Sequence, residues 1–349
     1  MKHRILGCLA FGVAVLGFSV APHADEKVKA VTSFSVLGDM VQQVGGDRVE
    51  VTMLVGPNGD AHVFSPTPAD AKMLAGADVF FVNGLGFEGW LERLETSSGF
   101  KGTTVVTSKG VKPLTMEEGH HHHGEEAEDE HGHDEHAKGE DHDEHDHDEH
   151  AKAEGHDEHD HDEHAKAEDH DEDEVSDPHA WQNLANGKIY VTNIRDALIA
   201  ADPEGKAVYE ANAARYLAAL EAEDKAVKAA VASLPEARRK IITSHDAFGY
   251  FADAYGLEVI APEGVSTESE ASAQDVAKII RQIREEKIPA VFLENVTDRR
   301  LLDQIAAETG AKIGGVLYSD ALSDADGPAP TYLDMFRHNI GTLTAALSS

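Results

Sequence analysis

Cysteine is almost absent from this 349-residue sequence, which has one, Cys8, within its first 24 residues. The remainder of the chain therefore has no disulfides and no thiolate metal ligands. Basic residues are also scarce, with 30 Lys and Arg against 65 Asp and Glu and a formal net charge of −35. A chain this acidic is repelled by phosphate backbones, which excludes nucleic acid as a partner.

Two common hydrolase signatures are missing as well. The sequence has no HExxH motif, which places two zinc-binding histidines on one helix, and no GxSxG elbow, which presents a nucleophilic serine. These absences weigh against a hydrolase, and we expect no enzyme.

Long apolar runs are confined to the N-terminus. Lys2 and Arg4 precede an apolar stretch, 5–20, which is followed by small residues up to Ala24. This pattern predicts a signal peptide over 1–24 and a mature protein in the periplasm. An uncleaved anchor is the alternative, although the run is short for a membrane span. Cys8 precedes most of the apolar run, so we do not expect a lipid attached to it.

The body of the chain alternates between strand-like and helix-like patterns, which predicts an α/β fold with parallel sheets. We expect two lobes, each a parallel-sheet α/β sandwich, joined by one long helix. The predicted domains are an N-terminal lobe (25–202), a linking helix (203–233) and a C-terminal lobe (234–349). The predicted strands are 28–32, 49–55, 78–82 and 103–107 in the first lobe and 240–243, 257–261, 290–293 and 312–318 in the second.

An acidic, histidine-rich insert interrupts the first lobe. Residues 117–174 contain 28 acidic residues, three Lys and 16 of the 22 His, and a 14-residue repeat starts at Asp134. So much charge with so few apolar groups predicts a disordered loop. Imidazoles beside carboxylates at this density would bind transition-metal ions weakly and many at a time. A solvated linker without a function of its own is the alternative.

Four histidines lie outside the insert and the signal peptide. His62 follows a strand in PNGDAHVFSPTPAD, His179 precedes a helix in DPHAW, and His245 ends a strand in IITSHDAFGYF. Open α/β sheets place their ligands at such strand ends, which makes these three candidate metal ligands. His338 lies within the last predicted helix, where we expect a surface or packing role.

Carboxylates near these histidines complete the set of candidates. Asp320 follows a strand in VLYSDALSD and is the fourth candidate ligand, with Glu294, at another strand end, as the alternative. Asp60 is the candidate to orient the His62 ring, because ligating histidines usually donate their other N–H to a carboxylate or carbonyl. Asp177 fits a turn or cap before Pro178.

These segments, in this order, resemble the ZnuA-like substrate-binding proteins of bacterial zinc and manganese ABC importers, and the resemblance covers essentially the whole mature chain. It is most specific in DPHAW and SHDAFGYFADAYGL. It implies two lobes packed about a long helix, with a metal ion in the cleft between them. The implied metal ligands are His62, His179, His245 and Asp320. Zinc-type members often carry a His-rich loop where 117–174 lies, whereas Ala61 stands where some have an acidic residue.

The chemistry of the four candidate ligands indicates which metal ion would bind. Three imidazoles and one carboxylate favour tetrahedral Zn²⁺ over Mn²⁺, which prefers more oxygen ligands. The resemblance agrees, since manganese-type members tend to have Glu where this chain has His245. We therefore expect Zn²⁺ as the transported substrate, with a manganese receptor as the alternative. The implied partners are an ABC permease and its ATPase, with a periplasmic zinc metallochaperone as a further candidate, and we expect a monomer.

Two other classes of function are alternatives to a receptor. A zinc hydrolase would need an open coordination position for water, which four protein ligands would close. A zinc buffer or storage protein would act through the His-rich insert. It would leave the two lobes without a role, so buffering is the alternative as a second activity of the insert.

Overall fold

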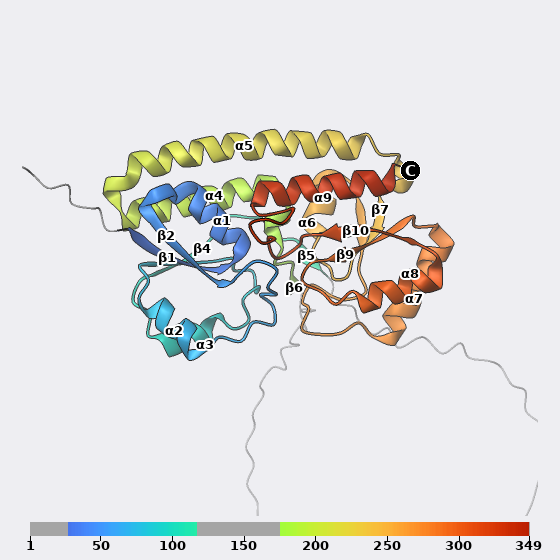
Figure 1. The fold of residues 1–349 in the computed structure, drawn as a ribbon, viewed down its shortest axis with the longest axis horizontal. Coiled ribbons are helices and arrows are strands. Elements are labelled where there is room, and N and C mark those ends of the chain that lie inside the picture. Colours follow the sequence, from blue (N-terminus) through green and yellow to red (C-terminus); the bar gives the residue numbers. More distant parts are fainter. Residues whose placement is uncertain (1–26, 117–174, 349) are drawn as a thin grey trace, which may run out of the picture. The chain divides into compact units, whose positions relative to one another are not determined.

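The computed structural model describes residues 27–116 and 175–348 (Figure 1). The predicted signal peptide, 1–24, and the His-rich insert, 117–174, lie outside the described residues. Two short strands, β5 and β6, pair with each other. They span Thr115–Met116 and Val175–Ser176. No helix in the described ranges has the length and apolar character needed to cross a membrane.

The first half of the body is a four-stranded sheet in the order β2-β1-β3-β4, with every neighbouring pair parallel. Its strands are β1 (Val28–Phe34), β2 (Val49–Val55), β3 (Val79–Val82) and β4 (Thr103–Val106), and its helices are α1 (Ser35–Gly45), α2 (Pro68–Ala75), α3 (Leu91–Ser98) and α4 (Leu184–Ala201). Helix α2 begins at Pro68, because Thr67 and Asp70 cap it reciprocally and Pro68 occupies its first turn.

The second half repeats this plan with the strand order β10-β9-β7-β8, again all parallel. Its strands are β7 (Lys240–Ile242), β8 (Glu258–Ile260), β9 (Ala290–Glu294) and β10 (Lys312–Leu317), and its helices are α6 (Gly249–Tyr255), α7 (Ala273–Glu286), α8 (Arg300–Thr309) and α9 (Tyr332–Leu347). The predicted class, two parallel-sheet α/β halves with a long helix, is confirmed.

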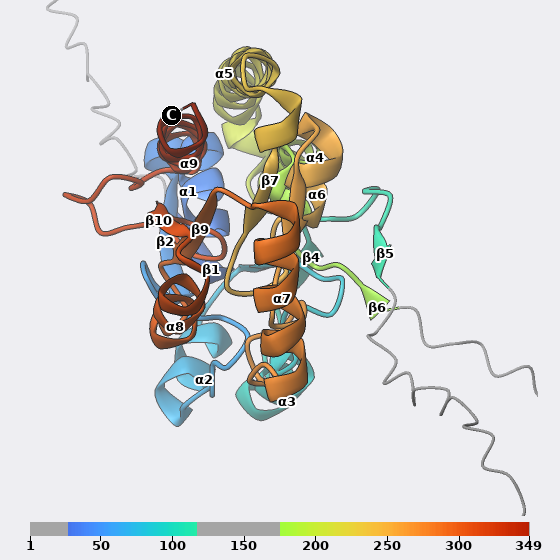
Figure 2. The same ribbon diagram turned by 90° about the vertical axis from the view of Figure 1, so that its right-hand side faces the viewer.

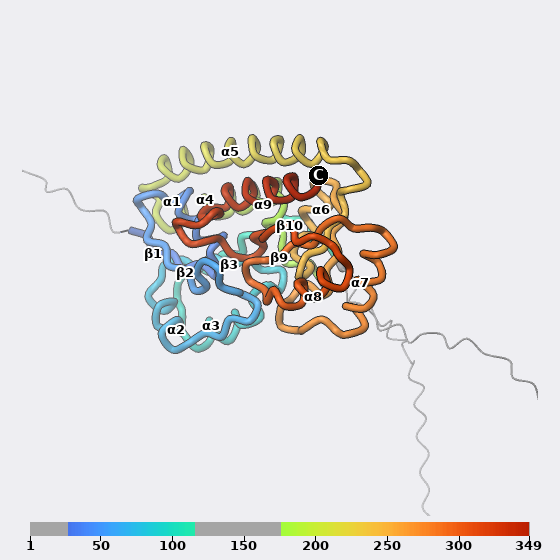
Figure 3. The backbone as a smooth tube through the Cα atoms, turned by 45° about the vertical axis from the view of Figure 1, so that its right-hand side comes forward, coloured from blue at the N-terminus to red at the C-terminus, as the bar shows by residue number. Residues whose placement is uncertain are grey.

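Helix α5 (Lys206–Ala232) runs along both halves (Figure 1). It packs on α1 and α4 of the first half and on α9 of the second, and Figure 3 shows α9 running beside it. It starts three residues later than predicted, because the Asp202 side chain caps a 3-10 turn over Pro203–Gly205 before the α-helix begins. The predicted division into domains stays a prediction.

The apolar core explains how the two halves are held together. One face of each sheet packs on a continuous core that includes α1, α4 and α5 together with α6 and α9. The other faces have separate cores, one with α2 and α3 and one with α7 and α8. Successive side chains of a strand point to opposite faces of the sheet, so Phe80 belongs to the core with α2 and α3 and the adjacent Phe81 belongs to the shared core. Figure 2 shows α2, α3, α7 and α8 on the side of the sheets away from α5.

Candidate metal centre

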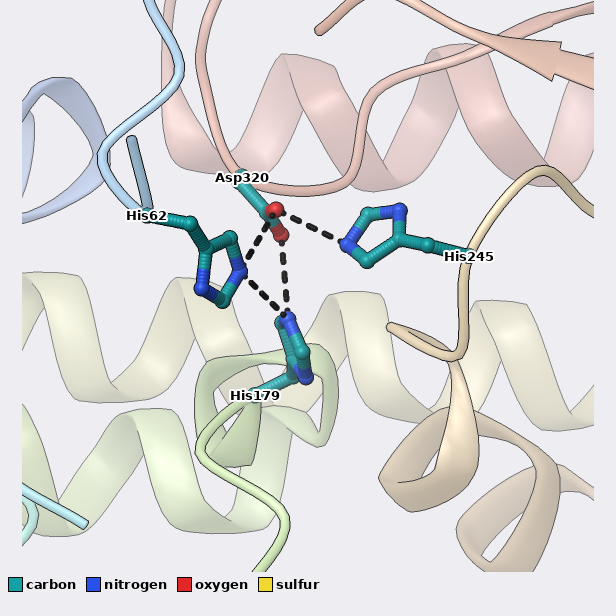
Figure 4. A group of neighbouring side chains, drawn as sticks. All are labelled: His62, His179, His245 and Asp320. Atoms are coloured by element: carbon teal, nitrogen blue, oxygen red, sulfur yellow. Dashed lines mark hydrogen bonds and ion pairs between the residues drawn. The ribbon is translucent and has the colours of Figure 1, made fainter. Parts of the chain in front are cut away.

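The four predicted ligands come together in one place (Figure 4). His62, His179, His245 and Asp320 each offer a ligand atom, and these atoms all lie within 4.8 Å of one another. Nε2 of His62 lies 3.3 Å from Nε2 of His179 and 3.4 Å from Oδ2 of Asp320. Nε2 of His245 lies 3.0 Å from the same Asp320 oxygen, and Nε2 of His179 lies 3.6 Å from Oδ1.

The group is closed off from solvent. His62 is 6% exposed and the other three residues are fully buried. Within the described part of the chain, neither Asp320 oxygen has a hydrogen-bond partner of good geometry, so the carboxylate meets only imidazole nitrogens. A buried carboxylate is costly unless a cation lies beside it, either a protonated imidazole or a metal ion.

The parallel sheets explain why these side chains meet. The loop after β2 contains His62, the loop after β7 contains His245, and the loop after β10 contains Asp320. The carboxyl ends of parallel strands face the same edge of a sheet, where open α/β folds place their ligands. His179 instead precedes a 3-10 turn, Ala180–Gln182, that leads into α4.

Asp177 orients the His179 ring. Its Oδ1 accepts hydrogen bonds from Nδ1 of His179 at 2.8 Å and from the backbone N–H of the same residue at 2.9 Å. With the proton fixed on Nδ1, the lone pair on Nε2 points to the centre.

Glu294 lies in the corresponding place beside His245. Its Oε2 lies 2.8 Å from Nδ1 of His245, and its Oε1 accepts from the backbone N–H groups of Ser244 and His245. Glu294 therefore lies behind the His245 ring, on the side away from Asp320.

These contacts set the charges of the metal-free centre. Burial on its own would lower the pKa of His245, but the carboxylates of Glu294 and Asp320 outweigh burial and raise that pKa well above its usual range. Burial likewise opposes ionisation of Asp320, but His245 and His179 hold its pKa well below the usual range. A cation that binds here displaces a proton from imidazole, so metal affinity falls with falling pH.

Aromatic rings form one wall of the centre. The ring of Phe87 lies edge-on to His62 with centroids 4.7 Å apart, and Trp181 lies 5.3 Å from the His179 ring. Phe34 packs on both Phe87 and Trp181. These rings keep water away from the imidazoles and limit their rotation.

The partners of the ring nitrogens differ from the sequence prediction. Asp60 does not orient the His62 ring: its Oδ1 accepts from the His62 backbone N–H at 2.9 Å, and its Oδ2 accepts from the Thr267 hydroxyl at 2.6 Å. The carboxylates behind the rings are Asp177, which the sequence fits to a turn or cap, and Glu294, the alternative ligand. The sequence does contain a signal for the role of Asp177, because Asp177 lies two residues before His179. The pairing of Glu294 with His245 depends on neighbouring strands, and no local motif shows it.

His338 lies elsewhere, as predicted. Its Nε2 is 2.9 Å from the Val316 carbonyl oxygen, and its ring packs edge-on against Tyr318.

Comparison with known proteins places this architecture in a class, the metal-binding substrate receptors of ABC importers, which are not enzymes. The family model described as "Zinc-uptake complex component A periplasmic" matches residues 30–346, and the chain belongs to this ZnuA family.

Relatives in this family are named for different metals. The manganese-binding lipoprotein MntA of Halalkalibacterium halodurans is 30% identical over 93% of this chain and 89% of its own length. The iron-binding protein YfeA of Yersinia pestis is 30% identical over 91% of this chain and 86% of its own. The solved structure of the periplasmic zinc-binding protein TroA of Treponema pallidum superposes with a TM-score of 0.74 at 27% identity, covering 92% of this chain and 99% of that one.

Proposed function

We propose that this protein captures Zn²⁺ through His62, His179, His245 and Asp320 and delivers it to the permease of an ABC importer. The observation that carries the proposal is the donor set and its spacing. Tetrahedral zinc with bonds of about 2.0–2.1 Å separates its ligand atoms by about 3.3–3.4 Å. Oδ2 of Asp320 lies 3.4 Å from Nε2 of His62 and 3.0 Å from Nε2 of His245, and the two nitrogens of His62 and His179 lie 3.3 Å apart, which is close to that separation; all four ligand atoms lie within 4.8 Å of one another.

The same donor set supports zinc over manganese. Three imidazole nitrogens and one carboxylate suit a four-coordinate borderline-soft ion, whereas Mn²⁺ prefers more oxygen ligands. Four protein ligands leave no position for a reactive water, in keeping with a receptor that binds and releases its cargo unchanged.

The family and the N-terminal sequence support a proposal for the setting. We propose that the mature protein works in the periplasm as a monomer. Its partners are an inner-membrane permease and its ATPase, with a zinc metallochaperone as a further partner. The His-rich insert, 117–174, would act as a low-affinity zinc collector, supported by its density of imidazoles. Deleting the insert is then expected to slow loading at scarce zinc and to leave the tight site intact.

The test is metal stoichiometry and affinity by competition with a chelator. The full chain, the form without 117–174 and His62→Ala in both forms are loaded with Zn²⁺ or Mn²⁺. We expect one tight Zn²⁺ per chain in both forms, weakened sharply by His62→Ala. Tighter Mn²⁺ than Zn²⁺ would make the protein a manganese receptor. No tight site without the insert would make the insert the main binder and the protein a buffer.

A further inference from the structure

The loop that contains Asp320 is hydrogen-bonded to the first half of the molecule, although it follows a strand of the second. The carbonyl oxygen of Ser319 accepts from Nε1 of Trp181 at 2.9 Å and from Nε2 of Gln182 at 2.6 Å. Both donors are fully buried and follow His179 by two and three residues. The backbone beside one candidate ligand is therefore tied to the turn beside another.

The loop is held on its other side as well. The backbone N–H of Leu322 donates to the Ser35 hydroxyl at 2.9 Å, and its carbonyl accepts from the backbone N–H of Asn58 at 2.8 Å. Ser35 starts α1 and Asn58 lies in the loop before His62. Asp320 thus lies between two attachments to the first half.

His245 is held differently. Its backbone N–H donates to Glu294, Ser244 accepts from the backbone N–H of Glu263, and the two residues His245 and Glu263 form a parallel bridge. These partners all belong to the second half. The Asp320 loop is also tied to the second half, because the Ala321 carbonyl accepts from Nδ2 of Asn295 at 3.2 Å. His62 and His179 are therefore fixed to the first half, Asp320 is attached to both halves, and His245 is fixed to the second.

We propose that Gln182, together with Trp181, is a positioning residue for Asp320. By holding the Ser319 carbonyl, the two side chains keep the carboxylate beside His62 and His179 before metal arrives. His62, His179 and Asp320 then form one side of the zinc site, and His245 faces them from the second half. This inference rests on the proposed function and adds to it the residues that place its carboxylate ligand.

Burying Gln182 at this position lowers the stability of the fold, so a purely structural role does not explain it. Its Oε1 is buried and, among the residues the structure describes, has no hydrogen-bond partner. A methionine of similar volume would remove that orphan acceptor, and Trp181 would still satisfy the Ser319 carbonyl. We therefore expect Gln182→Met to leave the thermal stability of the metal-free protein unchanged or raised. Its effect would appear in metal affinity alone.

The experiment is a set of double-mutant cycles read by Zn²⁺ competition on the full chain. Gln182→Met is made in the wild type, in Asp320→Ala and in His245→Ala, with chelators chosen to match each affinity. We expect about a fivefold loss in the wild type, the size of one hydrogen bond, and about the same loss in His245→Ala. In Asp320→Ala the loss should vanish, because no carboxylate is left to position.

Asn193→Leu is the matched control. Its amide donates to the carbonyls of Thr107 and Lys109, within the first half and away from the centre, so the same kind of bond is lost without effect on zinc. Trp181→Phe, which keeps an aromatic ring and removes the N–H, repeats the cycle if Gln182→Met does not fold.

An unchanged affinity in Gln182→Met would overturn the inference. So would an equal loss with and without Asp320, which would mean a general effect on folding or closure. If the wild type itself lacks one tight zinc, the proposed function fails instead, so the two failures are distinguishable.

Discussion

Asp177 provides a direct test of how the centre prepares His179. Its Oδ1 accepts from both the ring and the backbone N–H of that histidine. Asp177→Asn keeps an acceptor oxygen at this position but removes the negative charge that makes the imidazole a better donor to metal. Asp177→Ala removes the acceptor as well and leaves buried N–H groups of His179 without this partner.

The expected magnitudes follow from that difference. Loss of a carboxylate behind a ligating imidazole costs about 10- to 100-fold in metal affinity. Because asparagine keeps the acceptor, Asp177→Asn should lie near tenfold, or about 1.4 kcal/mol. Asp177→Ala should lie near 100-fold, or about 2.7 kcal/mol, and should also lower the melting temperature of the metal-free protein.

The assay is Zn²⁺ competition with a chelator, accompanied by thermal melts of the metal-free protein. Asp298→Asn is the matched control, because Asp298 accepts from the backbone N–H and Nε of Arg300, also two residues later, on an exposed surface. The control should bind zinc like the wild type. Asp177→Asn within twofold of the wild type would show that the charge of Asp177 does not tune the metal ligand.

Further predictions concern packing and charge. Gly249→Ala would place a Cβ 2.6 Å from Oδ2 of Asp177, so it should displace that carboxylate and weaken Zn²⁺ binding in the same competition assay. Gly256 has open space around it but is not a suitable control position, because its φ of +77° strains any side chain. His338→Ala should leave zinc affinity unchanged, since His338 contacts Val316 and Tyr318 and not the centre. The hydrogen bond from Arg48 holds the pKa of Asp202 at about 2, below the value of about 3.9 in an unfolded chain. The stabilisation is therefore full above about pH 4 and is lost as pH falls through about 2, so Asp202→Asn should lower the free energy of unfolding in urea by about 1–2 kcal/mol at pH 7 and by less at pH 2.

The fold could be predicted because its signals are local and agree with one another. Apolar runs such as 78–82 and caps such as Thr67 with Pro68 mark the strand and helix ends. Alternation of the two kinds of element then requires parallel sheets. The start of α5 was missed because Asp202 can cap either an α-helix or a 3-10 turn, and Arg48, which binds its carboxylate, is 154 residues away.

The candidate ligands could also be proposed from sequence, because the ends of strands and the few histidines outside the insert can be recognised there. Their supports could not. Glu294 lies behind His245 only because β7 and β9 are neighbours, and Gln182 reaches Ser319 only once the two halves are packed. Asp60 accepts from the backbone N–H of His62 and not from its ring as predicted, because sequence spacing does not distinguish a backbone N–H from a ring N–H.

The contact between His245 and Glu294 also determines how the centre could be turned toward manganese. Replacing an imidazole by a carboxylate supplies the oxygen donor that Mn²⁺ prefers. His245→Glu alone, however, would bring a second carboxylate beside Glu294, whose Oε2 lies 2.8 Å from Nδ1 of His245. Two carboxylates this close cannot both ionise at low cost, so the single variant should bind both metals poorly.

Adding Glu294→Gln removes that repulsion and keeps an acceptor for the backbone N–H groups of Ser244 and His245. The double variant should therefore recover metal binding and shift the ratio of Zn²⁺ to Mn²⁺ affinity toward manganese by about tenfold, about 1.4 kcal/mol, in parallel competition titrations. Glu294→Gln alone is the control and should weaken zinc without favouring manganese, since the three imidazoles stay. If His245→Glu by itself binds Mn²⁺ as tightly as the double variant, Glu294 does not constrain the charge of its neighbour. The selectivity would then depend on the four ligands alone.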